Sequence, residues 1–300
     1  MFKKNNMNFN IYNKKFLLIG ILMFIQLIFV LFADRIGFNK GIDFAGGIVV
    51  ESVCEKCNIQ VITKEISKKI GSNIQSQETS TGFLLKTTET KEYEKTLSTV
   101  KNVLKKHNAK VVSNDFVSPQ MTKTFIKDSI IACIFAFVCI GIYVFFRFNW
   151  KFAISAIIAL VYDVLFVVCF ISIIHIEVCL ITLTAILTII GYCINDKIVV
   201  MDRIKSNLDE VQKSTYNIVA SSVKNVLTRS VITSFTTAIV SLSLLFFGDR
   251  LIYDFGITII FGIFVGTISS LILVPSLLLA FNIEHRKNKN IVKDPMWYAS

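Results

Sequence analysis

The sequence is poor in charged residues and in proline, and both shortages exclude common classes of protein. Only 18% of its 300 residues are charged, where soluble chains carry about 25%, and 53% are hydrophobic. This composition excludes an intrinsically disordered chain. With three prolines the chain is neither collagen-like nor a proline-rich low-complexity protein, and seven cysteines are too few for a disulfide-rich scaffold.

The sequence contains long apolar runs. A helix that crosses the hydrocarbon core of a bilayer needs about 20 apolar residues. Six stretches meet this requirement, namely 16–33, 129–146, 152–174, 178–201, 230–248 and 255–283. The first has no small-residue cleavage pattern near Ala33, so we interpret it as a retained span and not a cleaved signal. The last is long enough to extend past the bilayer, and Pro275 is a point at which it can bend.

The basic residues predict one orientation for all six spans. The formal net charge is +11, and Lys and Arg concentrate in the short segments that an even number of crossings places on one side. We therefore expect the segments 1–15 and 284–300 to be cytoplasmic and residues 34–128 to be exported. The residues behind this prediction are Lys3, Lys4, Lys14, Lys15, Arg147, Lys151, Arg203, Lys205, Lys213, Lys224, Arg286, Lys287, Lys289 and Lys293.

The segment 34–128 has the pattern of a small α+β domain between the first two spans. Four short stretches indicate strands, at 48–53, 73–78, 83–88 and 110–116. Apolar residues at helical spacing indicate helices over 60–70 and from Tyr93 to Leu104. The order strand–helix–strand–strand–helix–strand is typical of the ferredoxin-like fold. The predicted fold class is thus a polytopic α-helical membrane protein, with six transmembrane helices and a ferredoxin-like domain.

Cys54 and Cys57 form a C-x-x-C pattern within this exported domain. One interpretation is a redox or metal half-site, and the other is a local disulfide or a pair of free thiols. A zinc site needs two further ligands, and the domain offers only His107 as a histidine. We therefore favour a local disulfide or a pair of free thiols, and we expect neither a metal nor a cofactor.

Three ionisable residues lie inside the predicted spans. Asp163, Asp196 and Lys197 each cost about 2.5–3.5 kcal/mol at a helix centre on insertion scales, so such residues normally face a partner or a wet cavity. Asp196 lies six residues before Asp202, about 9 Å along a helix, and Arg229 begins the fifth span from the same side. We expect Asp196 and Arg229 to meet there, as a proton relay or as a static pair.

Lys197 has three possible places. It can pair with Asp196, pair with Asp163, or snorkel to the inner membrane surface, and we favour snorkelling.

Polar and small residues recur at four-residue spacing on the last three spans. Small residues at this spacing on the sixth span allow close helix packing. The stripes are Thr184, Thr188, Tyr192 and Asp196, then Arg229, Thr233 and Thr236 or Thr237, then Gly262, Gly266 and Ser270.

Four motifs resemble, in order, those of the SecD/SecF family of bacterial protein-export membrane proteins. They are GIDFAGG at 41–47, FVSP at 116–119, GYCINDKIVVMDRI at 191–204 and LTRSVITS at 227–234. The resemblance covers essentially the whole chain. This family is part of the resistance–nodulation–division superfamily. The resemblance implies a subunit of the inner membrane that pairs with SecD, beside the SecYEG channel, SecA and possibly YidC. It also implies use of the proton-motive force in late steps of preprotein translocation, with no enzymatic chemistry and no nucleic-acid partner.

The resemblance places the membrane aspartate of the family at Asp196 and its paired arginine at Arg229. We hypothesise that Asp196 exchanges the proton, and that a polar path is lined by Asp163, Asn195 and Thr233. A glycine-permitted turn is expected to tie the exported domain to the first span, through Gly41, Asp43, Gly46 and Gly47.

Two features depart from the family pattern. Lys197 follows the aspartate where the family usually has Ser or Thr, and the interval from Asp196 to Arg229 is one residue short. Three other functions are alternatives. They are a scaffold without ion coupling, half of a small-molecule exporter, and an intramembrane aspartyl protease. The protease needs two carboxylates that share a proton, which nearby cations oppose.

Overall fold

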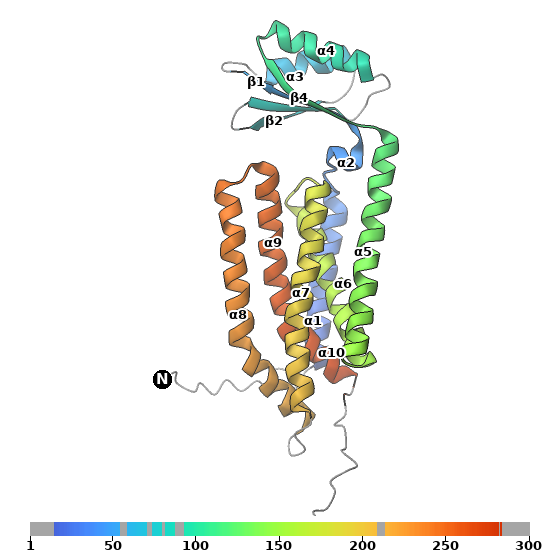
Figure 1. Cartoon of the computed structure of the whole chain (residues 1–300), viewed down its shortest axis with the longest axis vertical. Helices are drawn as coiled ribbons and strands as arrows, with labels where there is room; N and C mark the ends of the chain where they lie inside the picture. The colour runs from blue at the N-terminus through green and yellow to red at the C-terminus, as the bar shows by residue number, and fades with distance from the viewer. Residues whose placement is uncertain are drawn as a thin grey trace, which may run out of the picture.

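The protein is a helical bundle with an α/β domain at one end, as the ribbon of the computed structural model displays (Figure 1). The structure describes residues 15–54, 59–70, 74–79, 82–87, 93–208, 214–281 and 283. Within these residues, six helices are long and apolar enough to cross a membrane, which confirms the predicted fold class. Several orienting residues lie outside this description, namely Lys3, Lys4, Lys14, Lys213, Arg286, Lys287, Lys289 and Lys293.

Three helices form the centre of the bundle and three lie around them. The helices are α1 (Lys15–Ile36), α5 (Pro119–Arg147), α6 (Trp150–Ile173), α7 (Leu180–Asn207), α8 (Thr215–Phe247), and α9 (Arg250–Ile268) with its continuation. Helices α6, α7 and α9 carry most of the buried residues, whereas α1, α5 and α8 expose long apolar faces. Phe146 and Phe247 are 81% and 91% exposed, which suits contact with lipid or with another apolar chain and not with water.

Two of the outer helices begin well before their apolar stretches because capping residues fix their first turns. Ser118 accepts a hydrogen bond from the backbone N–H of Met121 at 3.2 Å, and a proline follows it at the first position of α5. Ser214 caps α8 in the same way through the N–H of Asn217 at 3.4 Å. Both helices therefore begin before the apolar stretches from which they were predicted.

The sixth span is interrupted by one wide turn. Helix α9 is followed by the π-helical turn η2 (Ser269–Leu273) and then by α10 (Val274–Ala280). The backbone N–H of Val274 bonds to the carbonyl of Ser269, five residues back. Pro275 comes next and has no N–H to donate, so the regular hydrogen-bond ladder is lost at the position where a bend was predicted.

Close approach of α9 to α7 depends on two glycines. A Cβ at Gly262 would lie 2.5 Å from the Cδ1 of Ile189, and one at Gly266 would lie 2.2 Å from the Sγ of Cys193. No side chain fits at these distances, so the small-residue stripe on the sixth span has the packing function that its spacing predicted.

The α/β domain has the predicted ferredoxin-like topology. Its elements are β1 (Gly47–Val53), α3 (Ile59–Ile70), β2 (Ile74–Thr79), β3 (Gly82–Thr87), α4 (Tyr93–Lys106) and β4 (Lys110–Val117). The strands form one antiparallel sheet in the order β2-β3-β1-β4, and α3 and α4 cover the face away from the bundle (Figure 1). Alternate residues of β1, such as Ile48 and Val50, point into the core beneath Ile62 and Leu104.

Candidate functional site

Lys197 and Asp163 form an ion pair in the interior of the helical bundle. The two side chains are 0% and 1% exposed, and the Lys197 Nζ donates to Asp163 Oδ2 across α7 and α6. The same ammonium also donates to the hydroxyl of Ser269 on the π-helical turn, at 3.0 Å. The expectation that Lys197 snorkels to the membrane surface is therefore wrong. A carboxylate and a hydroxyl within reach retain the charge inside the bundle.

A glycine of α9 lies beside this ion pair. A Cβ added to Gly266 would collide with the Sγ of Cys193 at 2.2 Å and would lie in ordinary van der Waals contact with Asp163 Oδ2, at 3.7 Å. The bare backbone of α9 thus lets α7 approach closely next to Asp163. Because both charges are buried away from water, removal of either partner is expected to lower the stability of the fold by about 3–5 kcal/mol.

Asp196 is buried but lacks such a partner. Its side chain is 4% exposed, and Oδ2 makes no hydrogen bond within the described part of the chain. Successive residues of a helix point about 100° apart, so Asp196 faces a different direction from Lys197. It lies about 24 Å along α7 from Leu180, in the half of the bundle farther from the α/β domain. A buried carboxylate oxygen without a partner is uncommon and suggests a functional site.

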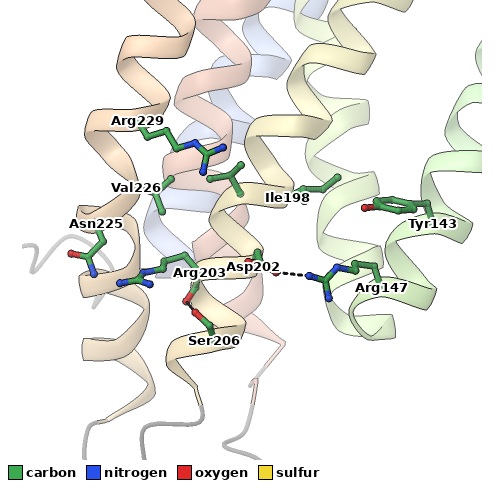
Figure 2. A pocket seen from close by; sticks show the side chains of 10 residues that line it. Tyr143, Arg147, Ile198, Asp202, Arg203, Ser206, Asn225, Val226 and Arg229 are labelled. Atoms are coloured by element: carbon green, nitrogen blue, oxygen red, sulfur yellow. Dashed lines mark hydrogen bonds and ion pairs between the residues drawn. The ribbon is translucent and has the colours of Figure 1, made fainter.

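Arg229 lies on α8 near Asp196, but the expected contact between them is not made in this structure. In the described residues no ion pair within 4.0 Å joins the two side chains, although Lys197 and, to a smaller extent, Arg229 act on Asp196 electrostatically through space. Arg229 is exposed and reaches from α8 towards α7 (Figure 2). The carboxylate of Asp196 is therefore buried, the guanidinium of Arg229 is exposed, and the two opposite charges are not in contact.

The guanidinium of Arg229 lines a polar pocket between three helices. This pocket has a volume of 530 Å³ and lies at the end of the bundle away from the α/β domain. Its wall also holds an ion pair from Arg147 on α5 to Asp202 on α7, at 3.0 Å (Figure 2). The lining residues are Tyr143, Arg147, Ile198, Val199, Asp202, Arg203, Ser206, Asn225, Val226 and Arg229. Three arginines against one aspartate make this pocket electropositive.

The other predicted site residues are not gathered around Asp196. Asn195 is exposed, and its side chain makes no hydrogen bond among the described residues. The hydroxyl of Thr233 donates to the carbonyls of Arg229 and Ser230 on its own helix, both at 3.0 Å. Asp163 is held by Lys197. The structure thus places Asp196 near Arg229 without contact, and it brings neither Asn195 nor Thr233 into hydrogen-bond contact with the carboxylate.

A chain of hydroxyl groups that the sequence did not reveal joins α7, α8 and α9. Tyr192 lies one turn before Asp196 and donates its hydroxyl to Ser234 at 3.3 Å. The Ser234 hydroxyl lies 2.6 Å from that of Thr267, which bonds in turn to the Ile263 carbonyl. Ser234 belongs to the LTRSVITS stretch and Tyr192 to a predicted stripe, but the pairing of their helices was needed to connect them.

The glycine-containing stretch at 41–47 joins the α/β domain to the beginning of α7. Asp43, in the short helix α2 (Ile42–Ala45), accepts a hydrogen bond from the backbone N–H of Leu180 at 2.9 Å, where α7 begins. The N–H of Gly41 donates to the Val178 carbonyl at 2.8 Å, and a Cβ there would lie equally close to that oxygen. Gly46 has a φ of 73°, which favours glycine. The motif therefore contacts the start of α7, and its short helix α2 also packs against α5.

An ion pair adds a second connection at the same place. Lys86 on β3 contacts the carboxylate of Glu177, in the connection between α6 and α7, with the Nζ 2.6 Å from Oε1. The two side chains are 16% and 14% exposed, so water screens this pair only partly. Helix α7 thus carries Asp196 and Lys197 within the bundle and is attached to the α/β domain at its beginning.

Metal ligands are not clustered in the described residues, where no group of three or more His, Cys, Asp and Glu side chains is arranged around a common point. Cys54 is disulfide-bonded, while Cys57 lies outside the described residues.

Comparison with known proteins places these features in one family. Residues 96–284 match the family model for "Protein export membrane protein SecD/SecF, C-terminal". The chain is similar to the protein translocase subunit SecF of Rickettsia typhi, with 31% identity over 97% of each chain. It is 32% identical to the SecF subunit of Rickettsia rickettsii over 96% of each chain. These relatives are named as components of a transport system.

Two solved structures have a similar fold. The crystal structure of SecDF from Thermus thermophilus, described as a translocon-associated membrane protein, aligns with a TM-score of 0.80 and 29% identity over 94% of this chain. SecDF in a "Super-membrane-facing form" aligns with a TM-score of 0.64 and 28% identity over 88%. The present chain spans 40% and 37% of those longer chains, so it corresponds to less than half of each.

Proposed function

Because this chain belongs to the SecD/SecF family of protein-export membrane proteins, we propose that it uses the proton-motive force to drive late steps of preprotein translocation. Its six apolar helices and its family make it a multi-pass protein of the inner membrane. The proposed orientation has cytoplasmic termini and an exported α/β domain. Its partner is a SecD-type chain, which supplies the part of SecDF that this chain does not span. SecYEG, SecA and YidC are proposed as further partners.

One observation carries this proposal. Asp196 is a buried carboxylate that, unlike Asp163, forms no ion pair within 4.0 Å among the described residues, and it lies near an electropositive pocket on the side that we assign to the cytoplasm. A charge within a membrane is costly, and a carboxylate that is fixed by no partner can gain and lose a proton with little rearrangement of its neighbours. Arg229 stabilises the ionised form from the pocket wall and is free to approach or withdraw as Asp196 changes charge.

The attachment of α7 to the α/β domain gives the proton a mechanical consequence. A change of charge at Asp196 alters how α7 packs against α8, and α7 begins where Asp43 and Glu177 hold the α/β domain. Movement of one elementary charge through 100 mV releases about 2.3 kcal/mol. This energy is comparable to that of a few hydrogen bonds, so several protons are enough to bias the position of a small domain.

The proposal is tested with inverted membrane vesicles that contain this chain and its SecD-type partner. A preprotein is arrested midway, ATP is removed, and completion of transport is followed with and without an imposed proton gradient. We expect Asp196→Asn to abolish the gradient-dependent part while the two chains still co-purify. Asp115→Asn, the same change at an exposed position of β4, serves as the matched control and leaves transport unaltered.

The alternatives predict different results in the same assay. A scaffold without ion coupling retains gradient-dependent transport in Asp196→Asn as long as the complex assembles. A small-molecule exporter gives no preprotein transport that depends on this chain. Replacement of the proton gradient by a sodium gradient distinguishes the two coupling ions, since carboxylates and hydroxyls accept either.

A further inference from the structure

Lys197 stands between two buried carboxylates and contacts only one of them. Its ammonium reaches Asp163 on α6 and Ser269 on η2, and it is wholly excluded from solvent. Asp196 precedes it in the chain but points elsewhere and forms no ion pair within 4.0 Å among the described residues. One oxygen of each carboxylate, Asp163 Oδ1 and Asp196 Oδ2, makes no hydrogen bond there, so the ion pair is what distinguishes them. The bundle therefore holds two aspartates in different electrical surroundings.

The groups around Asp163 are few. From α7 it is faced by Lys197 and the thiol of Cys193, with the charge of Asp196 farther away, and from its own helix by Tyr162. The π-helical turn contributes the hydroxyl of Ser269, and α9 contributes Gly266, which has no side chain. Lys197 is thus the only cation among the described residues in contact with Asp163, and its charge lies against the carboxylate without intervening water.

We infer that Lys197 keeps Asp163 as a permanent anion, so that Asp196 is the one of these two carboxylates that exchanges a proton. An opposite charge in direct contact favours the ionised form, and the effect is strongest in a low-dielectric interior. Protonation of Asp163 would leave the Lys197 ammonium buried without a counter-charge, a state that costs several kcal/mol. Asp196 has no such contact and therefore pays no comparable cost when it takes up a proton.

This inference changes the function assigned to Asp163 from the sequence. It was expected to line the path of the proton, and it instead forms a neutral pair with Lys197 that takes no part in proton exchange. Lys197 is accordingly a positioning residue, which acts through Asp163 and fixes α7 against α6 and the π-helical turn. The inference rests on the proposed function only for what the Asp196 proton accomplishes.

Infrared difference spectroscopy tests it on the full chain reconstituted in lipid vesicles. The C=O stretch of a protonated carboxyl is recorded across a pH titration, and subtraction of each variant from the wild type isolates one residue. We expect Asp196→Asn to remove a titrating band and Asp163→Asn to remove none. Lys197→Met should add a band, which the double variant Lys197→Met/Asp163→Asn loses again.

Two results overturn the inference. One is a titrating band that Asp163→Asn removes while Lys197 is present. The other is a Lys197→Met protein that gains no band assigned to Asp163. Should Asp163→Asn fail to insert, Asp163→Glu takes its place, because this change shifts only a carboxyl band that belongs to position 163, and a titrating band that moves in it overturns the inference. These spectra report protonation alone, so failure of the export assay leaves their outcome unchanged and the two proposals fail separately.

Discussion

Lys86 on the sheet and Glu177 between two membrane helices form an ion pair across 91 residues of sequence. This pair and the hydrogen bond from Leu180 to Asp43 lie at the same end of α7. Together they attach the α/β domain to the helix that carries both Asp196 and Lys197. The position of the domain and the packing of α7 are therefore linked physically, and each contact is open to test.

The Lys86–Glu177 pair is expected to restrain the α/β domain. Because a hydrogen bond to a charged group contributes about 1.5–3 kcal/mol, Glu177→Gln should accelerate hydrogen exchange of β3 amides about tenfold or more. The charge-reversed variant Lys86→Glu/Glu177→Lys restores the pair and should return exchange towards the wild-type rate. Unchanged protection in Glu177→Gln would show that the pair contributes nothing to docking.

The carboxylate of Asp43 acts as a cap for α7 although it lies far from that helix in sequence. Loss of a capping acceptor costs about 1 kcal/mol, so Asp43→Ala should lower the free energy of unfolding in detergent micelles by that amount. Asp43→Asn keeps an acceptor oxygen and should retain most of the stability. A wild-type value for Asp43→Ala would argue that the Leu180 N–H finds another partner.

Gly266 should tolerate no side chain. A Cβ would lie 2.2 Å from the Sγ of Cys193, and overpacking of this kind costs about 1–3 kcal/mol. We expect Gly266→Ala to lower the midpoint of thermal unfolding, whereas Gly191→Ala serves as the control because no atom lies within 4 Å of its added Cβ. Equal midpoints for the two variants would contradict the close packing of α9 on α7.

Glu65 on α3 should give the α/β domain an acid-sensitive contact. A hydrogen bond from His107 at 2.9 Å, with further bonds from Lys106 and Lys69, lowers the pKa of Glu65 from 4.5 to about 2. A lowered pKa means that the stabilisation is complete above pH 4.5 and is lost as the pH falls towards 2. Carboxyl carbon NMR of the labelled full chain checks this.

In that titration Glu65 should keep its ionised chemical shift at pH 4. His107→Leu removes the first of the three donors, so the Glu65 midpoint should move up towards 4.5. A Glu65 midpoint near 4.5 in the wild-type chain would exclude the link between α3 and α4.

Much of the fold was predictable because its signals are local. Each apolar run is continuous in the sequence, and the order of strands and helices in the α/β domain follows from residue spacing over a few turns. The early start of α8 at Thr215 was missed, since its first turns are amphipathic and not a continuous apolar run, with Ile218, Val219 and Val223 buried among polar residues after the cap at Ser214.

The surroundings of the ionisable residues were harder to predict, because they depend on how helices rotate against one another. Lys197 and Asp163 are 34 residues apart, and nothing between them fixes which face of α7 meets α6. The sequence offered Lys197 two carboxylates and the membrane surface, and snorkelling to that surface was favoured. The partner is evident only from the packing of α6 on α7 and the position of Ser269.

The π-helical turn at Ser269 also determines which way the last part of the chain faces. One extra residue in a turn rotates everything after it by about 100° relative to an unbroken helix. The segment before the turn packs on α6, α7 and α8, while α10 contacts these three helices and α1 as well. A single span thereby closes the bundle on two sides. Removal of one residue from this turn would rotate the whole of α10 about its axis without changing its composition.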